Sequence, residues 1–236
     1  MPSVGDAITA EAGAWTFGSG VAERFDSHVV RSLPMYEATH ALICDLADDF
    51  VPSRSCVYDL GCSTGTLLEL LALRLRDRQA EIVGVDVEPE MLARARLRCA
   101  RHPNVVFVEA DIVDLPLEPA HLVVAHYTLQ FIPPDRRGAV VSRVHAALRP
   151  GGAFLFFEKI SAPTAHLNEL VTAGYHSWKR SQGFSEEEIR AKAESLVGVL
   201  LPGTSATNHG LLTAAGFADI FPVFRWLNWE GLLALR

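Results

Sequence analysis

The chain has 236 residues, of which 49% are hydrophobic and 21% are charged, and its formal net charge is −7. This length suits one α/β domain with a helical insertion, and it can bury a sizeable core without disulfides or metal ions. The acidic balance and the scattered basic residues argue against unaided binding of a long nucleic acid, which usually needs a basic face. We therefore expect no direct nucleic-acid partner.

The cysteines and the apolar segments exclude further classes of protein. The spacings of Cys44, Cys56, Cys62 and Cys99 match no zinc pattern, so we expect no metal. The N-terminus shows no basic region followed by an apolar run, and no apolar stretch reaches the roughly 20 residues that span a bilayer. The sequence thus predicts a cytoplasmic protein with reduced cysteines and no membrane segment.

The predicted elements begin with an arm and continue into an alternation of strands and helices. Residues 1–20, rich in Gly, Ala and Ser, predict a mobile arm or lid, and residues 21–50 have helical apolar spacing. Apolar runs predict strands at Ser55–Leu60, Glu81–Asp86, Asn104–Glu109, Ala120–His126 and Ala153–Glu158, the last preceded by a turn at Pro150-Gly151-Gly152. Helical spacing predicts helices at Thr66–Arg76, Pro89–Arg101 and Pro134–Leu148.

The alternation of strands and helices stops after about residue 160. Two predicted helices, Thr164–Arg180 and Ser185–Leu200, do not fit it. We expect this pair to lie over the sheet as a helical cap on the substrate side, at about residues 162–202.

The C-terminal segment returns to the sheet. A helix is predicted at Ala206–Ala215, and Asp219–Phe224 and Asn228–Leu235 predict a closing antiparallel hairpin. Short apolar strands that alternate with helices imply a parallel sheet covered on both faces. We therefore expect an N-terminal arm, helix and lid at 1–50, and a binding domain at 51–236 built on a seven-stranded, mostly parallel sheet.

The first signal of chemistry is the loop Gly61-Cys62-Ser63-Thr64-Gly65 between a predicted strand and a predicted helix. A glycine-rich turn lets a ligand approach the backbone without obstruction by Cβ atoms. In an open parallel sheet such turns line the carboxyl edge, where ligands bind. The spacing is neither G-x-G-x-x-G nor that of a phosphate loop. The loop alone predicts a ligand-binding turn, with a tight turn without a ligand as the simpler alternative.

Carboxylates follow three of the predicted strands. Asp86 ends the second strand, where an acid could accept hydrogen bonds from both hydroxyls of a ribose. Asp111 follows the third strand and could receive the exocyclic amine of adenine, and Asp59 stands at the end of the first strand. Each acid alone could be a solvated side chain or a helix cap. Together, at successive strand ends, they favour one cofactor site.

These features together resemble the class I S-adenosylmethionine-dependent methyltransferases. The matching motifs are Val57-Tyr58-Asp59-Leu60-Gly61-Cys62-Ser63-Thr64-Gly65, Gly84-Val85-Asp86, Ala110-Asp111-Ile112 and Leu148-Arg149-Pro150-Gly151-Gly152. The resemblance covers about residues 55–235. It implies a Rossmann-like fold with S-adenosylmethionine as the cofactor.

A narrower resemblance is to the carboxy-S-adenosyl-L-methionine synthases of tRNA wobble-uridine modification. It rests on Trp15-Thr16-Phe17, Arg31-Ser32-Leu33-Pro34-Met35-Tyr36, Tyr127-Thr128-Leu129-Gln130-Phe131, Glu158-Lys159, Trp178-Lys179-Arg180 and Gly183-Phe184-Ser185-Glu186. Members of that family take a carboxyl group from prephenate onto the methyl carbon of the cofactor, and they form dimers. The resemblance therefore implies a homodimer, in which the N-terminal arm could be exchanged.

The resemblance also assigns the cofactor site. The implied cofactor-binding residues are Tyr36, Asp59, Gly61, Cys62, Ser63, Gly65, Asp86, Val87, Asp111, Ile112 and His126. Two positions depart from the family: this chain has His126 in place of an asparagine, and Ala193 in place of the arginine that pairs with the carboxylate of the modified cofactor. A carboxylate is best paired with a bidentate cation. Arg190, about one helical turn before Ala193, is the substitute that the sequence offers.

These departures favour a methyltransferase that uses the ordinary cofactor on a small-molecule acceptor, with secondary metabolism as one setting. A related transfer or cyclisation would use the same parts. His126 is the candidate base, because the unperturbed pKa of histidine lies near neutrality, although it could merely pack near the cofactor. Tyr127 is the second candidate catalytic residue.

The acceptor pocket is expected to be lined from the cap. The candidate substrate-binding residues are Tyr175, His176, Trp178 and Arg180, although an aromatic core stripe is the simpler role for Trp178. Two alternative functions stay open. One is carboxy-S-adenosyl-L-methionine synthesis from S-adenosylmethionine and prephenate, and the other is a non-catalytic S-adenosylmethionine-binding subunit whose partner performs the chemistry.

Overall fold

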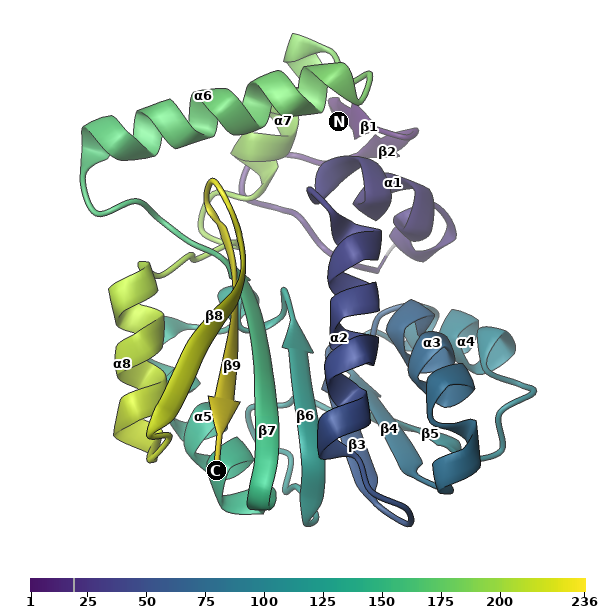
Figure 1. The fold of residues 1–236 in the computed structure, drawn as a ribbon. Helices are drawn as coiled ribbons and strands as arrows, with labels where there is room; N and C mark the ends of the chain where they lie inside the picture. The colour runs from purple at the N-terminus through teal and green to yellow at the C-terminus, as the bar shows by residue number, and fades with distance from the viewer. Residues whose placement is uncertain (19) are drawn as a thin grey trace.

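A seven-stranded sheet forms the centre of the structure, a computed structural model that describes residues 1–18 and 20–236. The strands lie in the order β5-β4-β3-β6-β7-β9-β8 (Figure 1). Their bounds are β3 Cys56–Leu60, β4 Glu81–Asp86, β5 Val105–Glu109, β6 Ala120–His126, β7 Leu148–Lys159, β8 Asp219–Trp226 and β9 Trp229–Leu235. Neighbours from β5 to β7 are parallel, and β9 runs antiparallel to both β7 and β8. The predicted mostly parallel sheet with a closing hairpin is confirmed.

The strand order creates a topological switch point between β3 and β6. From β3 the chain proceeds outward through β4 to β5, and it then returns to β6 on the other side of β3. In open α/β sheets, ligands bind beyond the carboxyl ends of the strands at such a point. The loops that follow β3, β4 and β6 are therefore where the fold places a ligand.

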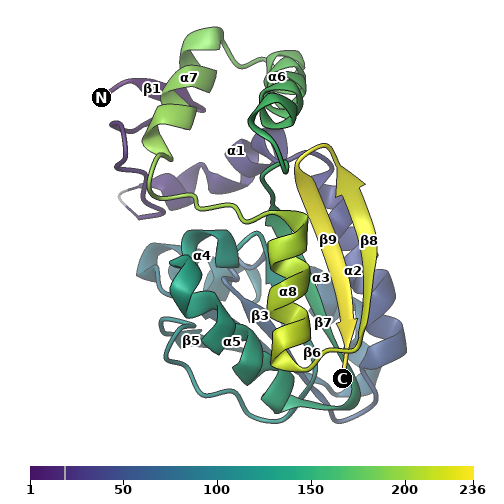
Figure 2. The same ribbon diagram turned by 90° about the vertical axis from the view of Figure 1, so that its left-hand side faces the viewer.

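Helices cover both faces of this sheet (Figures 1 and 2). Successive strand residues point to opposite faces, so Val57 joins the core shared with α2 and α3, and Tyr58 joins the core shared with α5 and α8. The helices are η1 Val21–Glu23, α1 Phe25–Ser32, α2 Tyr36–Phe50, α3 Thr66–Arg74, η2 Arg76–Arg78, α4 Pro89–Arg98, η3 Leu129–Phe131, α5 Pro134–Ala147, α6 Ala165–Ser181, α7 Glu186–Ser195 and α8 Ser205–Ala215.

The turn predicted at residues 150–152 is wrong, because β7 continues through it. The register of β7 against β6 shifts near the start of the strand, which marks a bulge. Gly151 has a φ of +78°, and its N–H donates to the carbonyl of Arg236 at 2.8 Å. The glycines therefore bend the strand while its hydrogen bonds hold it in the sheet.

The N-terminal arm contains a short hairpin that packs on the cap. Its strands are β1 Ser3–Gly5 and β2 Ile8–Thr9, and Val4 is fully buried. Further along the arm, the N–H groups of Gly13 and Trp15 donate to the carbonyls of Glu194 and Ser195 at the end of α7. The predicted arm is thus fastened to α7 in the described residues; Ser19 lies outside them.

The predicted helical region 21–50 is divided at Leu33-Pro34-Met35. Leu33 has an extended backbone, with φ −108° and ψ 118°, as expected for a residue that precedes proline. The break lets α1 and α2 serve different layers. Helix α2 packs on the sheet, whereas α1 joins the cap.

The cap has a small hydrophobic core of its own. Val4, Trp15, Phe25, Val29 and Ala191 belong to it, so the arm, α1 and α7 are joined by one apolar cluster. Figure 2 shows α6 and α7 above the carboxyl edge of the sheet, with α1 alongside. The expected helical cap is confirmed, and the domain boundary at residue 50 stays a prediction.

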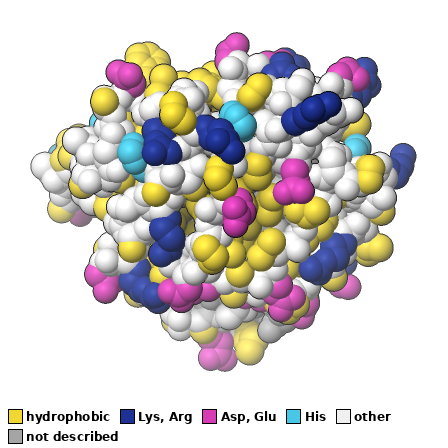
Figure 3. Space-filling view, turned by 90° about the horizontal axis from the view of Figure 1, so that it is seen from below, with side chains coloured by type: hydrophobic (Ala, Val, Ile, Leu, Met, Phe, Trp, Pro, Cys, Tyr) yellow, Lys and Arg dark blue, Asp and Glu magenta, His cyan; other side chains and the backbone are white. Residues whose placement is uncertain are grey.

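Charges are mixed on the surface seen from below. Acidic and basic side chains are interspersed there around a central group of apolar ones (Figure 3). None of the described helices has the length and apolar character needed to cross a membrane.

Candidate functional site

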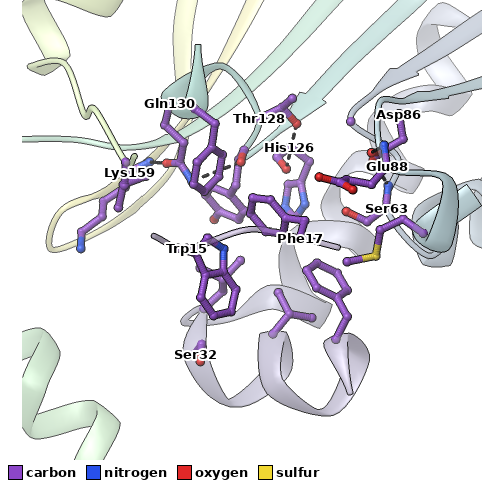
Figure 4. A pocket seen from close by; sticks show the side chains of 18 of the residues that line it. Trp15, Phe17, Ser32, Ser63, Asp86, Glu88, His126, Thr128, Gln130 and Lys159 are labelled. Carbon is purple, nitrogen blue, oxygen red and sulfur yellow. Dashed lines mark hydrogen bonds between the residues drawn. The ribbon is translucent and has the colours of Figure 1, made fainter. Parts of the chain in front are cut away.

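A cavity of about 590 Å³ lies between the carboxyl edge of the sheet and the cap (Figure 4). Small-molecule sites usually have volumes of about 300–1,000 Å³. The predicted site residues that line it are Tyr36, Asp59, Gly61, Cys62, Ser63, Asp86, Val87, Asp111, Ile112, His126, Tyr127, Tyr175 and His176. The structure thus brings the cofactor and acceptor candidates into one space.

The glycine loop is held against β4 by its backbone. The N–H groups of Gly61 and Cys62 both donate to the carbonyl of Val85, at 2.8 and 2.9 Å. Gly61 has a φ of +84°, and a Cβ atom there would lie 2.5 Å from the side chain of Thr128. A side chain at Gly61 is therefore excluded both by backbone conformation and by space.

Gly65 supports the loop from outside the cavity. It has a φ of +78°, and a Cβ atom there would lie 2.9 Å from the side chain of Ala95 on α4. This glycine therefore lets the start of α3 pack closely on α4, and its predicted cofactor contact stays a prediction.

Asp86 is fixed by two backbone donors. Its Oδ2 accepts from the Ser63 N–H at 2.8 Å, and its Oδ1 accepts from the Glu88 N–H at 2.9 Å. Burial raises the pKa of Asp86, and these N–H groups oppose the rise. Each carboxylate oxygen keeps a second lone pair, so the side chain can still accept hydrogen bonds from ribose hydroxyls.

Asp59 is the carboxyl group with the least favourable surroundings in this part of the cavity. It is 2% exposed, and no hydrogen bond to its carboxylate occurs among the described residues. Burial, together with the nearby charge of Asp86, raises the pKa of Asp59 to about 7. A cation placed beside it would lower that pKa, so Asp59 suits the positively charged groups of S-adenosylmethionine.

The third acidic position suits an adenine ring. Asp111 uses one carboxylate oxygen to accept from the Val113 N–H at 2.8 Å, which leaves the other oxygen available. Val87 and Ile112 also line the cavity, and Val87 is 60% exposed. Apolar side chains beside a carboxylate can hold a flat base and receive its exocyclic amine.

His126 lies in a cluster of rings. Its ring centroid is 4.7 Å from that of His40 and 5.4 Å from that of Tyr36. The Thr39 hydroxyl donates to the carbonyl of Tyr36, so it accepts from the Nε2–H of His126 at 3.0 Å. This geometry assigns the ring proton to Nε2 and leaves Nδ1 as a hydrogen-bond acceptor.

The surroundings of His126 do not favour its predicted role as the base. Burial, and then the neighbouring His40, hold the pKa of His126 well below its usual value. The ring is therefore neutral at neutral pH, but it is a weak base, because its conjugate acid gives up the proton readily. A hydrogen-bonding role fits His126 better than proton removal.

Tyr127 is held in a strained conformation directly after β6. Its φ is +62°, a region that costs a bulky residue about 1–3 kcal/mol and is often found at functional sites. Its hydroxyl is buried and has no hydrogen-bond partner among residues 1–18 and 20–236. Burial raises the pKa of Tyr127 above its usual value, so the phenol stays protonated at neutral pH.

The cap contributes two of its four predicted substrate-binding residues. The Tyr175 hydroxyl donates to the carbonyl of Ser32 at 2.7 Å, which joins α6 to α1, and His176 lies beside it in the cavity lining. Trp178 lies outside the lining, and its ring packs against that of Trp226 at 5.8 Å. The structure thus favours the packing role for Trp178, and its substrate contact stays a prediction.

Arg180 and Arg190 are both exposed and lie outside the lining. Arg180 pairs with Glu186 at 2.9 Å, and Arg190 lies 4.0 Å from Glu194. Their side chains point to solvent because both occupy the outer faces of the cap helices. The structure thus does not bring Arg180 to the cavity, and its predicted acceptor contact stays a prediction. Ala193 lines the cavity, whereas Arg190 does not.

Three lysines in the lining were missed by the sequence-based assignment. Lys159 ends β7, Lys179 lies on α6 and Lys192 lies on α7. These lysines lie within or beside the motifs on which the family resemblance rests, but the sequence assigned no function to them. The sequence could have singled them out, because the chain contains no other lysine.

Comparisons with known proteins identify relatives of the chain. Residues 57–152 match the family model described as a methyltransferase domain. The chain is 37% identical over 222 residues to the carboxy-S-adenosyl-L-methionine synthase of Wolinella succinogenes, which spans 93% of this chain and 92% of that protein. The synthase of Desulfotalea psychrophila is also 37% identical, over 223 residues, with 93% and 91% covered.

A solved structure supports the fold. The N-methyltransferase NodS of Bradyrhizobium japonicum, in complex with S-adenosyl-L-homocysteine, superimposes with a TM-score of 0.56 at 18% identity, over 85% of this chain and 86% of that chain. This likeness concerns the fold alone. The methyltransferase-domain match and the synthase relatives show that the chain is a transferase enzyme with S-adenosylmethionine as its cofactor. With identity and coverage of this extent, the chain belongs to the carboxy-S-adenosyl-L-methionine synthase family of class I S-adenosylmethionine-dependent methyltransferases.

Proposed function

We propose that the chain transfers the methyl group of S-adenosylmethionine to a small molecule bound beneath the cap. The observation that carries this proposal is the single cavity joining the carboxylates at the sheet edge to α6 and α7. When bound, S-adenosylmethionine supplies an electrophilic methyl carbon on a sulfonium sulfur. Because methyl transfer is an in-line displacement, the main task of the protein is to hold acceptor and cofactor in one aligned geometry.

The acidic end of the cavity holds the cofactor. Asp86 accepts from the ribose hydroxyls through its remaining lone pairs, and Asp111 receives the exocyclic amine. Asp59 offers a buried negative charge to the positively charged part of the cofactor. Three carboxylates held on neighbouring strand ends support this assignment, because the cofactor presents donors and positive charge along its length.

Aromatic side chains close the reaction space. The ring of Phe17 packs edge-on against Phe131 at 4.9 Å and against Trp15 at 5.8 Å. In Figure 4, Trp15 and Phe17 lie between Lys159 on one side and Asp86 on the other. These rings exclude water from the middle of the cavity, which strengthens the polar interactions at both ends.

The absence of a strong base among the predicted catalytic residues restricts the acceptor. His126 is a weak base and Tyr127 stays protonated, as derived above. The acceptor is therefore one whose nucleophilic atom needs no strong base, and Nδ1 of His126 orients it by accepting a hydrogen bond.

The test is transfer of an isotope-labelled methyl group. The purified chain is incubated with labelled S-adenosylmethionine and with separate pools of small carboxylic acids, phenols and amines. We expect S-adenosylhomocysteine and a labelled product to form with one pool and not without an acceptor. If the label stays on the cofactor with every pool, the proposal fails.

A second candidate function is carboxy-S-adenosyl-L-methionine synthesis from prephenate. It is favoured by the identity of 37% across nearly the whole length of two synthases, and it is opposed by Ala193 in the cavity lining. Incubation with S-adenosylmethionine and prephenate, followed by mass spectrometry of the nucleoside, tests it. A carboxylated nucleoside would establish this function in place of methyl transfer.

Four further expectations remain proposals. They are a homodimer, a cytoplasmic location, an acceptor from secondary metabolism and the lack of a direct nucleic-acid partner. Light scattering during size-exclusion chromatography tests the first of them, with twice the monomer mass of 25.8 kDa as the expected result.

A further inference from the structure

Three ammonium groups converge on the cap end of the cavity. Lys159, Lys179 and Lys192 come from β7, α6 and α7, and all three line the cavity. The chain has 21 basic residues, and since these are its only lysines, the other 18 (21 − 3) are arginines. Because the two side chains are not interchangeable, the confinement of lysine to this one place indicates a use for compact ammonium groups there.

Aromatic rings, not carboxylates, are the immediate neighbours of these ammonium groups. Among the described residues, no hydrogen bond or ion pair is formed by the ammonium group of a lysine; Lys159 and Lys192 form side-chain hydrogen bonds only through their backbone. A ring face attracts a cation, but more weakly than a paired carboxylate does. The distances from Nζ to the ring centroid are 4.8 Å for Lys159 and Tyr175, 4.1 Å for Lys179 and Phe184, and 2.5 Å for Lys192 and Trp15.

The carboxylates that act on Lys179 are already engaged. Asp6 pairs with Arg31 at 2.5 Å and with His28 at 2.9 Å. Glu188 completes the capping box at the start of α7 by accepting from the Ser185 N–H. Neither acid is therefore available to neutralise the lysine cluster.

The cluster is electrostatically unfavourable as it stands. Lys179 is 2% exposed, and burying an unpaired charge carries a large free-energy cost. Burial lowers the pKa of both Lys159 and Lys179 to about 8, and for Lys179 the charge of Lys159 adds to the effect. Burial, and then Lys179, hold the pKa of Lys192 well below its usual value. A bound anion would relieve the desolvation and the repulsion together.

We infer that Lys159, Lys179 and Lys192 form a binding subsite for the carboxylate of the acceptor, a small carboxylic acid with an apolar body. The inference rests on the proposed function, which places an acceptor beneath the cap. Tyr175 and Trp229 line the same end and supply apolar surface for the rest of the molecule. Figure 4 shows Lys159 on the far side of the cavity from Asp86, which separates this subsite from the ribose-binding acid.

The experiment compares acids with neutral molecules of the same shape. Calorimetry measures binding of benzoate and 3-phenylpropionate, and of benzamide and 3-phenylpropanamide, to protein saturated with S-adenosylhomocysteine. At least one acid is expected to bind about tenfold more tightly than its amide, the usual effect of a hydrogen bond to a charged group. Equal binding of each acid and its amide, or no binding of any acid, overturns the inference.

Matched variants locate the effect on the cavity lysines. Lys179→Met and Lys192→Met keep the apolar stem of the side chain, and they are expected to weaken acid binding about tenfold without changing amide binding. Arg190→Met removes an exposed cation from α7, the helix that carries Lys192, and is expected to change neither. If the lysine variants weaken binding of S-adenosylhomocysteine itself as much as acid binding, the cluster serves the carboxylate of the cofactor and the inference fails.

The binding results and the proposed function can fail separately. These measurements need no turnover, so they stand even if no methyl transfer is found. Conversely, methyl transfer to a neutral acceptor at an unchanged rate in Lys179→Met would preserve the proposed function and overturn the carboxylate subsite.

Discussion

The two ends of the cavity carry opposite charge and are built in opposite ways. At the sheet edge, the carboxylate of Asp86 is fixed by backbone N–H groups of its own and the neighbouring loop. At the cap end, Lys159, Lys179 and Lys192 contact aromatic rings and have no carboxylate partner among the described residues. The acidic end is therefore largely preorganised before a ligand binds. The lysine-lined end obtains its negatively charged partner only when an anion binds.

This difference separates cofactor recognition from acceptor recognition. Groups at the strand ends, which the fold itself supplies, bind the cofactor that all methyltransferases of this class share. Side chains at the cap end bind the acceptor, which differs from one enzyme to another. The following substitutions test whether the two ends act independently.

The largest effect is expected for Asp86→Ala at the acidic end. The change removes the acceptor for the ribose hydroxyls and also leaves the Ser63 and Glu88 N–H groups without a partner. Affinity for S-adenosylmethionine measured by calorimetry should fall at least about 100-fold. Asp114→Ala removes an exposed acid that pairs with Arg136 and should leave the affinity unchanged. Equal affinities of Asp86→Ala and the unmodified protein would show that the cofactor site is misplaced.

Gly61→Ala tests the loop that forms the floor of the acidic end. A Cβ atom would meet the Thr128 side chain at 2.5 Å in a backbone conformation with φ +84°. The free energy of unfolding, measured with urea, should fall by about 2–4 kcal/mol, from backbone strain and overpacking together. Gly198→Ala is the control, because Gly198 has a similar φ of +76° with no atom within 4 Å. Its loss should be about 1–2 kcal/mol, and equal losses in the two variants would rule out the steric contribution of Thr128.

Asp59 should make cofactor binding depend on pH. Its pKa in the free protein is raised to about 7, so the carboxyl group must lose a proton before it can pair with a cation. Affinity for S-adenosylmethionine should therefore rise about tenfold from pH 6 to pH 8 and then level off. The stability that protonated Asp59 gives the free protein has the opposite trend: it is present below the unfolded-state pKa and is lost as the pH rises through 7. Asp59→Asn should remove the pH dependence of binding, and affinity that falls with rising pH would contradict this role.

The smallest effect is expected for Arg180→Ala at the outer face of the cap. Its pair with Glu186 is exposed, and such surface pairs contribute about 0–1 kcal/mol. Initial-rate measurements of methyl transfer should match those of the unmodified chain. A large loss of rate would support the predicted acceptor contact of Arg180 and weaken the distinction between inner lysines and outer arginines.

The fold and the acidic end could be predicted because they depend on local patterns. The alternation of apolar strands and helices indicated the sheet, and the loop at Gly61 with Asp86 and Asp111 indicated the cofactor. The bulge at Gly151 was missed because a glycine pair predicts a turn, and only the hydrogen bonds of the finished sheet show that the strand continues.

The cap end could not be predicted because it depends on contacts between distant segments. Trp178, Lys179 and Arg180 are consecutive, yet one packs, one lines the cavity and one faces solvent. Which residue of a helix faces inward is decided by what the helix packs against. The lowered pKa of His126 likewise follows from burial and from His40, a residue on α2, whereas His126 ends β6.

The central claim is methyl transfer from the ordinary cofactor, and the mass of the nucleoside product tests it most directly. One incubation contains the purified chain, S-adenosylmethionine, prephenate and the small-acid pool. We expect the recovered nucleoside to be S-adenosylhomocysteine, with the methyl group transferred to an acid. Recovery of carboxylated S-adenosylmethionine instead would show that the chain does not act as a methyltransferase on this acid pool.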